Sequence, residues 1–484
     1  MRRLLSEPAR YLQDLGLGAL HAWRAFFFTP ADPTPLGLVR VCVGVLLFWN
    51  LAVLGLDLHD YLGSEGWIGP EAVRQFLAEQ SPWAWSFWLW IPDRWLHLAW
   101  AGCLLVTALF TLGLGTRVTA VLAWAIAVST VRRAPVALFG FDHMVSTWAF
   151  YLAAFGASGQ SVSLDRFLFR FRALAWRGLE GAPGRLALDD PQTGIPAPTV
   201  SANLSLRLIQ LHLVLIYGSA GLSKLMGPEW WNGTALEMIM LTPEFRRFDL
   251  AWLAAYPSLL SLATHAGVLL EISFPVLVWT NKLRPLLLVS VALMHLGIDL
   301  CMGLTEFGLA MVAATLAFAS GPWLRSLVTG IEPSTGHLLF DGRSPRRRTL
   351  ARLILAADPD RFLRAIDTST ADVSELPRGL TPAQAHDSLI LVRADGRTTS
   401  GPDAVLIVAR WSPLLWPVGV LGGLPGARSL CRRAIRWCCD LGDSTQPHPG
   451  DRSRTGLGGA LPADVDARGV KTRPLEPTTV MSTR

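Results

Sequence analysis

Charged residues are scarce in this sequence of 484 residues: only 17% are Asp, Glu, Lys or Arg, whereas 51% are hydrophobic. An ordinary soluble domain carries about 25% charged residues. A soluble protein of this length would need a far more polar surface to face water. The shortage of charge therefore argues against an ordinary soluble protein and favours a polytopic integral membrane protein.

Closely spaced cysteines are also missing. The six cysteines form no C-x-x-C pair; they are Cys42, Cys103, Cys301, Cys431, Cys438 and Cys439. Zinc sites and the disulfide frameworks of small secreted domains both require patterned cysteine spacing. The sequence therefore supports neither, and no metal site is predicted.

Tyrosine and lysine are rare. The chain has 20 tryptophans and only 5 tyrosines, and its lysines are limited to Lys224, Lys282 and Lys471. Tryptophan is enriched where a membrane protein crosses the lipid–water interface. The formal net charge of +6 is interpreted as basic residues on the cytoplasmic side, and no nucleic acid partner is predicted.

Long apolar runs take the place of the missing polar surface. A membrane-crossing helix needs about 20 mostly apolar residues, and about eight such spans are predicted. They cover residues 36–56, 95–115, 117–138, 143–160, 206–226, 258–280, 284–303 and 305–325. The tryptophan-rich run 80–92 is too short and is predicted to be interfacial or re-entrant. The expected fold is an all-α polytopic membrane bundle.

Loop charges predict the orientation. Residues 1–25 form a basic amphipathic segment, expected on the membrane surface, and the bundle is assigned to residues 26–325. The loop 57–94 is acidic and the loop 161–205 is basic, so alternation places both termini in the cytoplasm. The expected location is the plasma (inner) membrane of a bacterium. Only Arg132 and Arg133 disagree with this topology.

The composition changes after the bundle. Residues 337–439 read as a small soluble α/β module, with short strands expected at 337–342 and 388–396. Residues 440–484 are rich in Gly, Pro, Ser and charge without periodicity, and are predicted to be disordered.

Ionisable side chains inside a membrane are functional candidates. The predicted topology brings His143, Lys224 and His295 to one extracytoplasmic cluster. Lysine can lose its proton when it is desolvated, whereas arginine effectively cannot. Lys224 could instead be an anchor at a helix end, and His143 a helix-start residue.

Two further residues favour structural interpretations. His265 is expected to be a packed histidine with satisfied hydrogen bonds. Glu271 lies in the middle of a predicted span and is expected to pair with a neighbouring helix.

The stretch YGSAGLSKLMGPEWWNGTAL (217–236) resembles a segment of vitamin K-dependent γ-glutamyl carboxylase and of its bacterial relatives, the horizontally transferred transmembrane (HTTM) domain proteins. Four other stretches agree with the resemblance, which covers about residues 25–320. They are FFFTPADPTPLGLVRVCVGVLLF (26–48), DYLGSEGWIGP (60–70), FDHMVSTWAFYLAAFGASGQSVSLD (141–165) and LLEISFPVLVW (269–279).

The resemblance implies a carboxylase and epoxidase, a lyase in class, with vitamin K hydroquinone or another quinol as cofactor. By position, Lys224 would be the base that deprotonates the hydroquinone, His143 would assist it, and His295 matches more loosely. The implied partners are the lipid bilayer, a quinone and a peptide substrate. The chain has no counterpart of the carboxylase's long luminal β-rich region, so a non-catalytic protein that binds a lipid, a quinone or a protein partner remains the alternative. A transporter is disfavoured because no internal repeat is visible.

The second module resembles another family. LLFDGRSPRRRTLARLI (338–354) is similar to the opening of the thioredoxin-like DCC family, which carries Asp-Gly-x-Cys-x-x-Cys. Ser344 and Arg347 occupy the two cysteine positions. Without thiolates no dithiol exchange is possible, so the resemblance implies a thioredoxin-like scaffold without redox activity.

Overall fold

The computed structural model describes residues 2–135, 139–177, 196–242, 247–248, 251–329, 336–358, 363–371, 377, 389–393, 395–412 and 415–439. The tail that is predicted to be disordered, 440–484, lies outside these residues.

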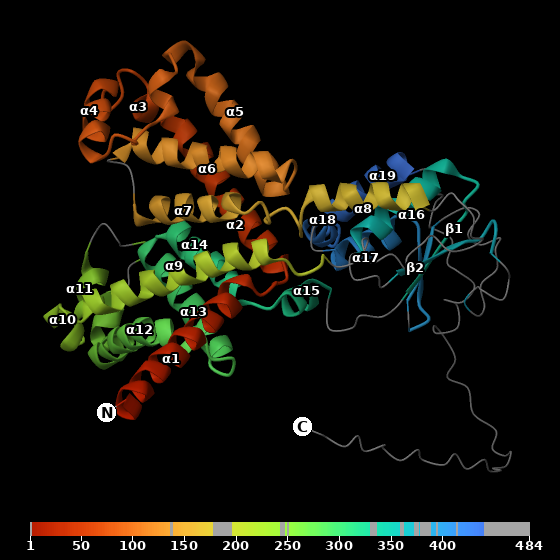
Figure 1. Ribbon diagram of the computed structural model, residues 1–484. Coiled ribbons are helices and arrows are strands. Elements are labelled where there is room, and N and C mark those ends of the chain that lie inside the picture. The colour runs from red at the N-terminus through yellow and green to blue at the C-terminus, as the bar shows by residue number, and fades with distance from the viewer. Residues whose placement is uncertain are drawn as a thin grey trace. The chain divides into compact units, whose positions relative to one another are not determined.

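Each predicted membrane span coincides with a helix (Figure 1). The helices are α2 (Thr34–Leu54), α5 (Asp93–Leu112), α6 (Thr116–Arg133), α7 (Gly140–Ala154), α9 (Val200–Lys224), α12 (Pro257–Leu277), α13 (Arg284–Met302) and α14 (Thr305–Thr315). The last one is shorter than the predicted span 305–325: after the 3-10 turn η7 (Leu316–Phe318) the chain turns into the separate helix α15 (Gly321–Thr329). The amphipathic N-terminal segment is the helix α1 (Arg2–Phe28).

Among the described residues, five helices are long and apolar enough to cross a bilayer: α2 with its extension to Leu62, α5, α9, α12 and α13. The helices α7 and α14 are shorter, and α6 carries Arg117, Arg132 and Arg133. The structure therefore gives a mostly helical bundle with five candidate spans, and the number eight stays a prediction.

The outside of the bundle is apolar where lipid would surround it. Leu215 on α9, Leu269 and Val276 on α12 and Leu286 on α13 are each exposed by 65% or more. Inside, Trp148 and Phe274 are fully buried in one large apolar core. Large aliphatic side chains on the outer surface are costly in water, whereas the hydrocarbon of a bilayer accepts them.

A buried arginine fixes one end of the bundle. Arg40 on α2 has no exposed surface. Its guanidinium donates to the carbonyls of Ser158 at 2.8 Å, Val162 at 2.5 Å and Thr111 at 3.4 Å. The end of α5 and the segment after α7 are thereby held beside α2.

Two more contacts belong to this end. Ala31 and Thr199 exchange backbone hydrogen bonds of 3.1 and 2.9 Å, which joins the approach to α2 with the approach to α9. Arg325 on α15 pairs with Asp32 at 2.7 Å. The starts of α2 and α9, the end of α5 and the start of α15 therefore share one end, as the predicted alternation requires.

Arg132 and Arg133, the exceptions to the charge pattern, bind the loop 57–94. Arg133 is 1% exposed and donates to the carbonyls of Gly63 at 2.6 Å and Ile68 at 3.0 Å. Arg132 donates to the Trp83 carbonyl at 3.2 Å. Since both guanidinium groups bind carbonyls of this loop, they are structural cations and not free charges that report on orientation.

The loop 57–94 folds onto α6 and forms no long helix. It contains α3 (Leu58–Leu62), α4 (Pro70–Gln80) and the 3-10 turn η2 (Phe87–Trp90). The indole N–H of Trp88 donates to Thr130 Oγ1 at 3.1 Å, and Ser86 Oγ donates to the Ser129 carbonyl at 2.7 Å. The prediction that 80–92 adds no further span is confirmed.

The C-terminal module contains a four-stranded mixed sheet in the order β2-β1-β3-β4. Its strands are β1 (Gly336–Phe340), β2 (Leu363–Asp367), β3 (Ile390–Val392) and β4 (Thr398–Ser400). The strand β1 is parallel to β2 and antiparallel to β3, and β3 is antiparallel to β4. The two predicted strands coincide with β1 and β3, whereas β2 and β4 were not predicted.

The described helices of the module pack on one face of this sheet. They are α16 (Pro345–Ala357), α17 (Pro402–Trp411), α18 (Trp416–Leu421) and α19 (Ala427–Cys439). The helices α16 and α17 contact the strands, and α18 and α19 pack on these helices. A helix from the basic loop, α8 (Leu164–Arg177), lies along α16 (Figure 1) and places Leu174 in the module's core. Arg170 on α8 also donates to the Leu355 carbonyl at 3.1 Å. The module's core therefore includes a segment that the sequence assigned to the membrane part.

Candidate functional site

The helices α9 and α12 approach each other closely because α9 presents glycines. A Cβ on Gly221 would lie 2.9 Å from Cγ1 of Ile272 and 3.1 Å from its backbone nitrogen, which is too close for any side chain. One turn earlier, Gly218 lies against Pro275. Small residues of this kind allow two helix backbones to come together in a membrane protein. The contact sets the register that brings Lys224 beside Glu271.

Lys224 forms an ion pair with Glu271. Its Nζ donates to both carboxylate oxygens, with 2.5 Å to Oε2. The Lys224 side chain is 25% exposed and that of Glu271 is 9% exposed, and the ammonium lies 5.0 Å from the centre of the Trp230 ring. The predicted pairing of Glu271 with a neighbouring helix is confirmed. Lys224 is turned inward to a carboxylate and is not extended to the membrane surface.

A second buried polar pair lies on α9 and α13. Tyr217 Oη and His295 Nε2 are 2.8 Å apart, and the two residues are 2% and 3% exposed. The Tyr217 ring lies 4.4 Å from that of Phe274, and the His295 ring lies 5.3 Å from that of Phe307. The other ring nitrogen of His295, Nδ1, is buried and has no hydrogen-bond partner among the described residues.

The two pairs form one cluster. Tyr217 and Lys224 are separated by two helical turns on α9 and so lie on the same face. On α12, Glu271 lies one turn before Phe274, whose ring packs against Tyr217. We call Tyr217, Lys224, Glu271 and His295 the polar cluster. It combines an amine, a carboxylate, a phenol and an imidazole, all groups that can exchange protons.

His143 lies apart from the polar cluster. It is exposed near the start of α7, where its carbonyl accepts hydrogen bonds from Ser146 at 2.9 Å and Thr147 at 2.8 Å. Among the described residues the structure records no contact of its imidazole with Lys224 or His295. The structure thus brings two of the three predicted site residues together and leaves His143 at a helix start.

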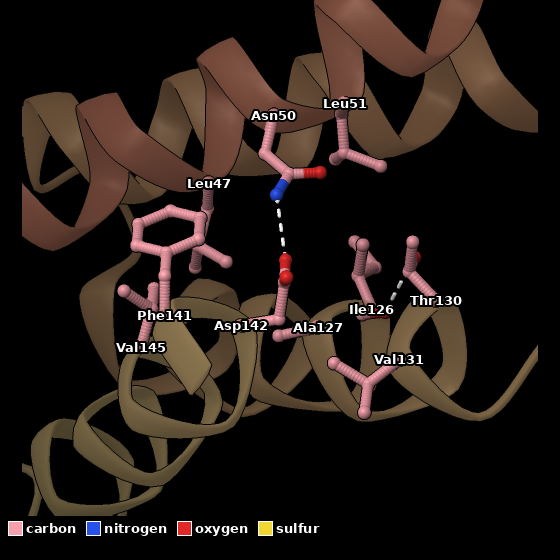
Figure 2. Close-up of a pocket in the computed structure, with 10 residues that line it drawn as sticks. All are labelled: Leu47, Asn50, Leu51, Ile126, Ala127, Thr130, Val131, Phe141, Asp142 and Val145. Carbon is pink, nitrogen blue, oxygen red and sulfur yellow. Dashed lines mark hydrogen bonds between the residues drawn. The ribbon is translucent and has the colours of Figure 1, made fainter. Parts of the chain in front are cut away.

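The neighbour of His143 lines a small cavity between α2, α6 and α7 (Figure 2). Asp142 accepts a hydrogen bond of 2.8 Å from Asn50 Nδ2 across this cavity, which has a volume of about 20 Å³. Its other walls are mainly apolar, including Leu47, Phe141 and Val145. A space of this size has room for about one water molecule, so it is too small to hold a substrate.

Both ring nitrogens of His265 lie near backbone carbonyls, but the residue is exposed, whereas the sequence predicts a packed histidine. Its Nδ1 lies 2.7 Å from the Ser261 carbonyl and its Nε2 lies 3.1 Å from the Trp231 carbonyl. The second contact holds α10 (Pro228–Trp231) against α12, next to the end of α9. Asp299 likewise has a local role: it accepts from Thr305 Oγ1 at 2.5 Å and pairs with Arg247 at 3.4 Å.

Tyr217 was missed as a site residue by sequence reasoning. It lies in the motif around Lys224, but a tyrosine carries no charge and is therefore not conspicuous in an apolar helix. Its spacing from Lys224 was the available signal, since residues seven apart share a helix face. Among the described residues, no group of three or more His, Cys, Asp or Glu side chains could hold a metal ion.

Comparison with known proteins gives one family. Residues 190–323 match the HTTM domain. The match spans less than half of the chain and contains all four residues of the polar cluster. No curated protein and no solved structure matches the chain. The HTTM match and the apolar helices together identify an integral membrane protein whose helices contact lipid.

Proposed function

We propose that this integral membrane protein is an enzyme that removes a proton from a lipid-soluble hydroxyl compound of the quinol class, with Lys224 as the base. The observation that carries the proposal is the polar cluster: an amine paired with a carboxylate beside a buried tyrosine–histidine pair, enclosed by apolar helices. More specifically, we propose that the quinol is vitamin K hydroquinone. Its oxidation would be coupled to carboxylation of a peptide glutamate, as in the carboxylase that residues 217–236 resemble.

The residues fit such a ligand. A buried polar atom without a partner is costly, and His295 Nδ1 is such an atom among the described residues. A ligand hydroxyl or carbonyl would give it a partner. A bound quinol would supply the hydroxyl proton and the reducing electrons. Phe274 and Phe307, which flank Tyr217 and His295, suit an aromatic ring.

Lys224 can act as a base because Glu271 can take its proton. The Lys224 Nζ lies within hydrogen-bond distance of both Glu271 oxygens, so a proton can pass directly from the ammonium to the carboxylate and leave a neutral amine. The amine form of Lys224 accepts the ligand's hydroxyl proton at Nζ. The resulting ammonium then neutralises the negative charge left on the ligand oxygen, while Glu271 stays protonated.

The test uses the full chain in nanodiscs and vitamin K hydroquinone as the probe. Chromatography of the lipid extract follows its aerobic conversion to epoxide and quinone, with empty nanodiscs as the blank for autoxidation. We expect Lys224→Arg to lose the conversion, because arginine keeps the positive charge but cannot release a proton. The matched control Lys282→Arg changes an exposed lysine in the turn after α12 and should keep it.

Conversion by the Lys224→Arg variant at the wild-type rate would show that Lys224 is not the base.

A second candidate function is non-catalytic binding of a quinone, lipid or protein partner by the same cluster, which the close pairing of Lys224 with Glu271 favours. It predicts a quinone that co-purifies with the wild type and is released chemically unchanged. Incorporation of labelled carbon dioxide into a glutamate-containing peptide would test the proposed carboxylation.

For the second module we propose a thioredoxin-like scaffold without dithiol chemistry. The mixed sheet, with a parallel β1–β2 pair connected through α16 and an antiparallel β3–β4 pair, supports it. Ser344 is the N-cap of α16 and accepts a hydrogen bond of 3.5 Å from the Arg347 N–H. A serine at this position caps the helix, where the resembling family has a reactive cysteine.

A further inference from the structure

The helices α18 and α19 of the C-terminal module expose large apolar side chains. The exposed fractions run from 38% at Val420 to 67% at Leu430. The others are Trp416, Val418, Leu421 and Leu424. We call residues 416–433 the α18–α19 surface. Large exposed apolar side chains on two successive helices of a small module indicate a surface that binds something.

The charge around these side chains has one sign. Residues 415–439 contain no Asp or Glu, and their arginines are Arg428, Arg432, Arg433 and Arg436. Arg428 and Arg432 pair with Asp403 on α17, the former at 3.3 Å. Arg433 is exposed and lies one turn after Leu430 on the outer side of α19. The surface therefore combines apolar side chains with cationic ones.

This combination favours a bilayer over a protein partner. Exposed Trp and Leu side chains with an arginine beside them are typical of short helices that lie in the membrane interface. A second copy of the same surface would bring arginine against arginine. The chain is already held in a membrane by its helices, so the local concentration of lipid surface around the module is high and weak contacts suffice.

We propose that the α18–α19 surface binds the surface of an anionic bilayer, with Trp416, Leu421 and Leu430 in the headgroup region and Arg433 against the lipid phosphates. The contact would hold the C-terminal module on the membrane that contains the bundle. It is independent of quinol chemistry, because no residue of the polar cluster takes part.

The test is amide hydrogen exchange of the full chain in two kinds of nanodisc, one of neutral phosphatidylcholine and one half phosphatidylglycerol. We expect amides of residues 416–436 to exchange at least about fivefold more slowly in the anionic nanodiscs, since one arginine near an anionic surface is worth about this factor. High salt should remove the difference, because it screens exposed charges. Amides of α16 should not change.

The variant Leu430→Gln/Arg433→Gln should lose the protection, whereas the matched control Arg397→Gln should keep it. Arg397 is an exposed arginine in the turn before β4, away from the surface. Equal exchange in both nanodiscs would overturn the proposal. Protection that disappears when residues 443–484 are removed would assign the surface to the chain's own tail, and protection that rises with protein concentration in lipid-free micelles would assign it to a second copy.

Discussion

At the scale of single residues, the ion pair of Lys224 and Glu271 is the central feature of the bundle. The pair lies at a helix contact made close by Gly221, where the Glu271 side chain is 9% exposed and that of Lys224 is 25% exposed. A buried ion pair contributes little net stability compared with apolar residues, but removal of one partner leaves an unpaired charge at high cost.

We therefore expect Lys224→Met alone to lower the free energy of unfolding by about 3 kcal/mol, and Glu271→Leu alone by a similar amount. The double variant Lys224→Met/Glu271→Leu should lower the free energy of unfolding by less than either single change, because no unpaired charge stays buried. Denaturant titration in detergent measures the cycle. Lys282→Met is the control and should leave stability unchanged. If the two single effects add up in the double variant, the pair does not form.

The same scale explains the anomaly of Arg132 and Arg133. Read as charges, they contradict the predicted topology, but as hydrogen-bond donors they bind carbonyls of the loop 57–94. A guanidinium group has several donors in a fixed plane and can hold two carbonyls at once. Arg40 does the same at the other end of the bundle.

At the scale of elements, the turn between α5 and α6 depends on a residue from another helix. The helix α5 ends at Gly113 in the left-handed conformation, with φ of 71°, and a Cβ there would strike the Arg40 guanidinium. The helix α6 then begins without a cap of its own. Asp165 of α8 supplies one by accepting from the backbone N–H groups of Gly115 at 2.8 Å and Thr116 at 2.7 Å.

This cap predicts a pH dependence. Partial burial alone would raise the pKa of Asp165, but the hydrogen bonds from Thr116 and Gly115 and the charge of Arg40 lower it below its usual value. Because the folded pKa is depressed, the cap's contribution is complete above the unfolded pKa of about 3.9 and is lost as the pH falls through the lower, folded pKa.

We expect Asp165→Ala to lower the free energy of unfolding by about 1 kcal/mol at pH 7, the usual cost of removing a helix cap. The difference from the wild type should begin to shrink as the pH falls below about 4 and continue to shrink as the pH approaches the lower, folded pKa. Denaturant titrations between pH 7 and pH 3 measure it. Glu71→Gln is the control, because the Glu71 side chain is 91% exposed. A difference that stays constant across this range would mean that the carboxylate's charge is irrelevant to the cap.

At the scale of the whole molecule, hydrogen bonds and one ion pair sort the helix ends into two groups. The contacts of Arg40, Thr199 and Arg325 define one end, and those of Arg133 define the other. This grouping agrees with the alternation of loop charges and supports the proposal that both termini lie in the cytoplasm.

Reporter fusions test this topology. Alkaline phosphatase fused after Gln80 or Gly303 should be active, because these positions belong to the predicted extracytoplasmic end. Fused after Gly115 or Thr329 it should be inactive, and green fluorescent protein at these two positions should fluoresce. Immunoblots control for expression. Equal phosphatase activity after Gln80 and Gly115 would contradict the crossing of the membrane by α5.

The helices of the membrane bundle follow from the amino-acid sequence alone. Scarce charge and long apolar runs located each of its helices, because a helix in lipid must be apolar along its whole length. Local composition also located the module and its strands β1 and β3. The sequence listed Lys224, Glu271 and His295 as candidates because an ionisable group inside such a run is conspicuous.

The partners of these ionisable residues, in contrast, follow from the way the helices pack together. The pairing of Lys224 with Glu271 and of Tyr217 with His295 depends on the register of α9 against α12 and α13, which close packing at Gly221 sets and no local pattern encodes. The position of His143 apart from the polar cluster and the packing of α8 in the module's core also depend on how the helices pack together. A periodic pattern shows which face of a helix is apolar, whereas the identity of the neighbour depends on how the faces of several helices fit together.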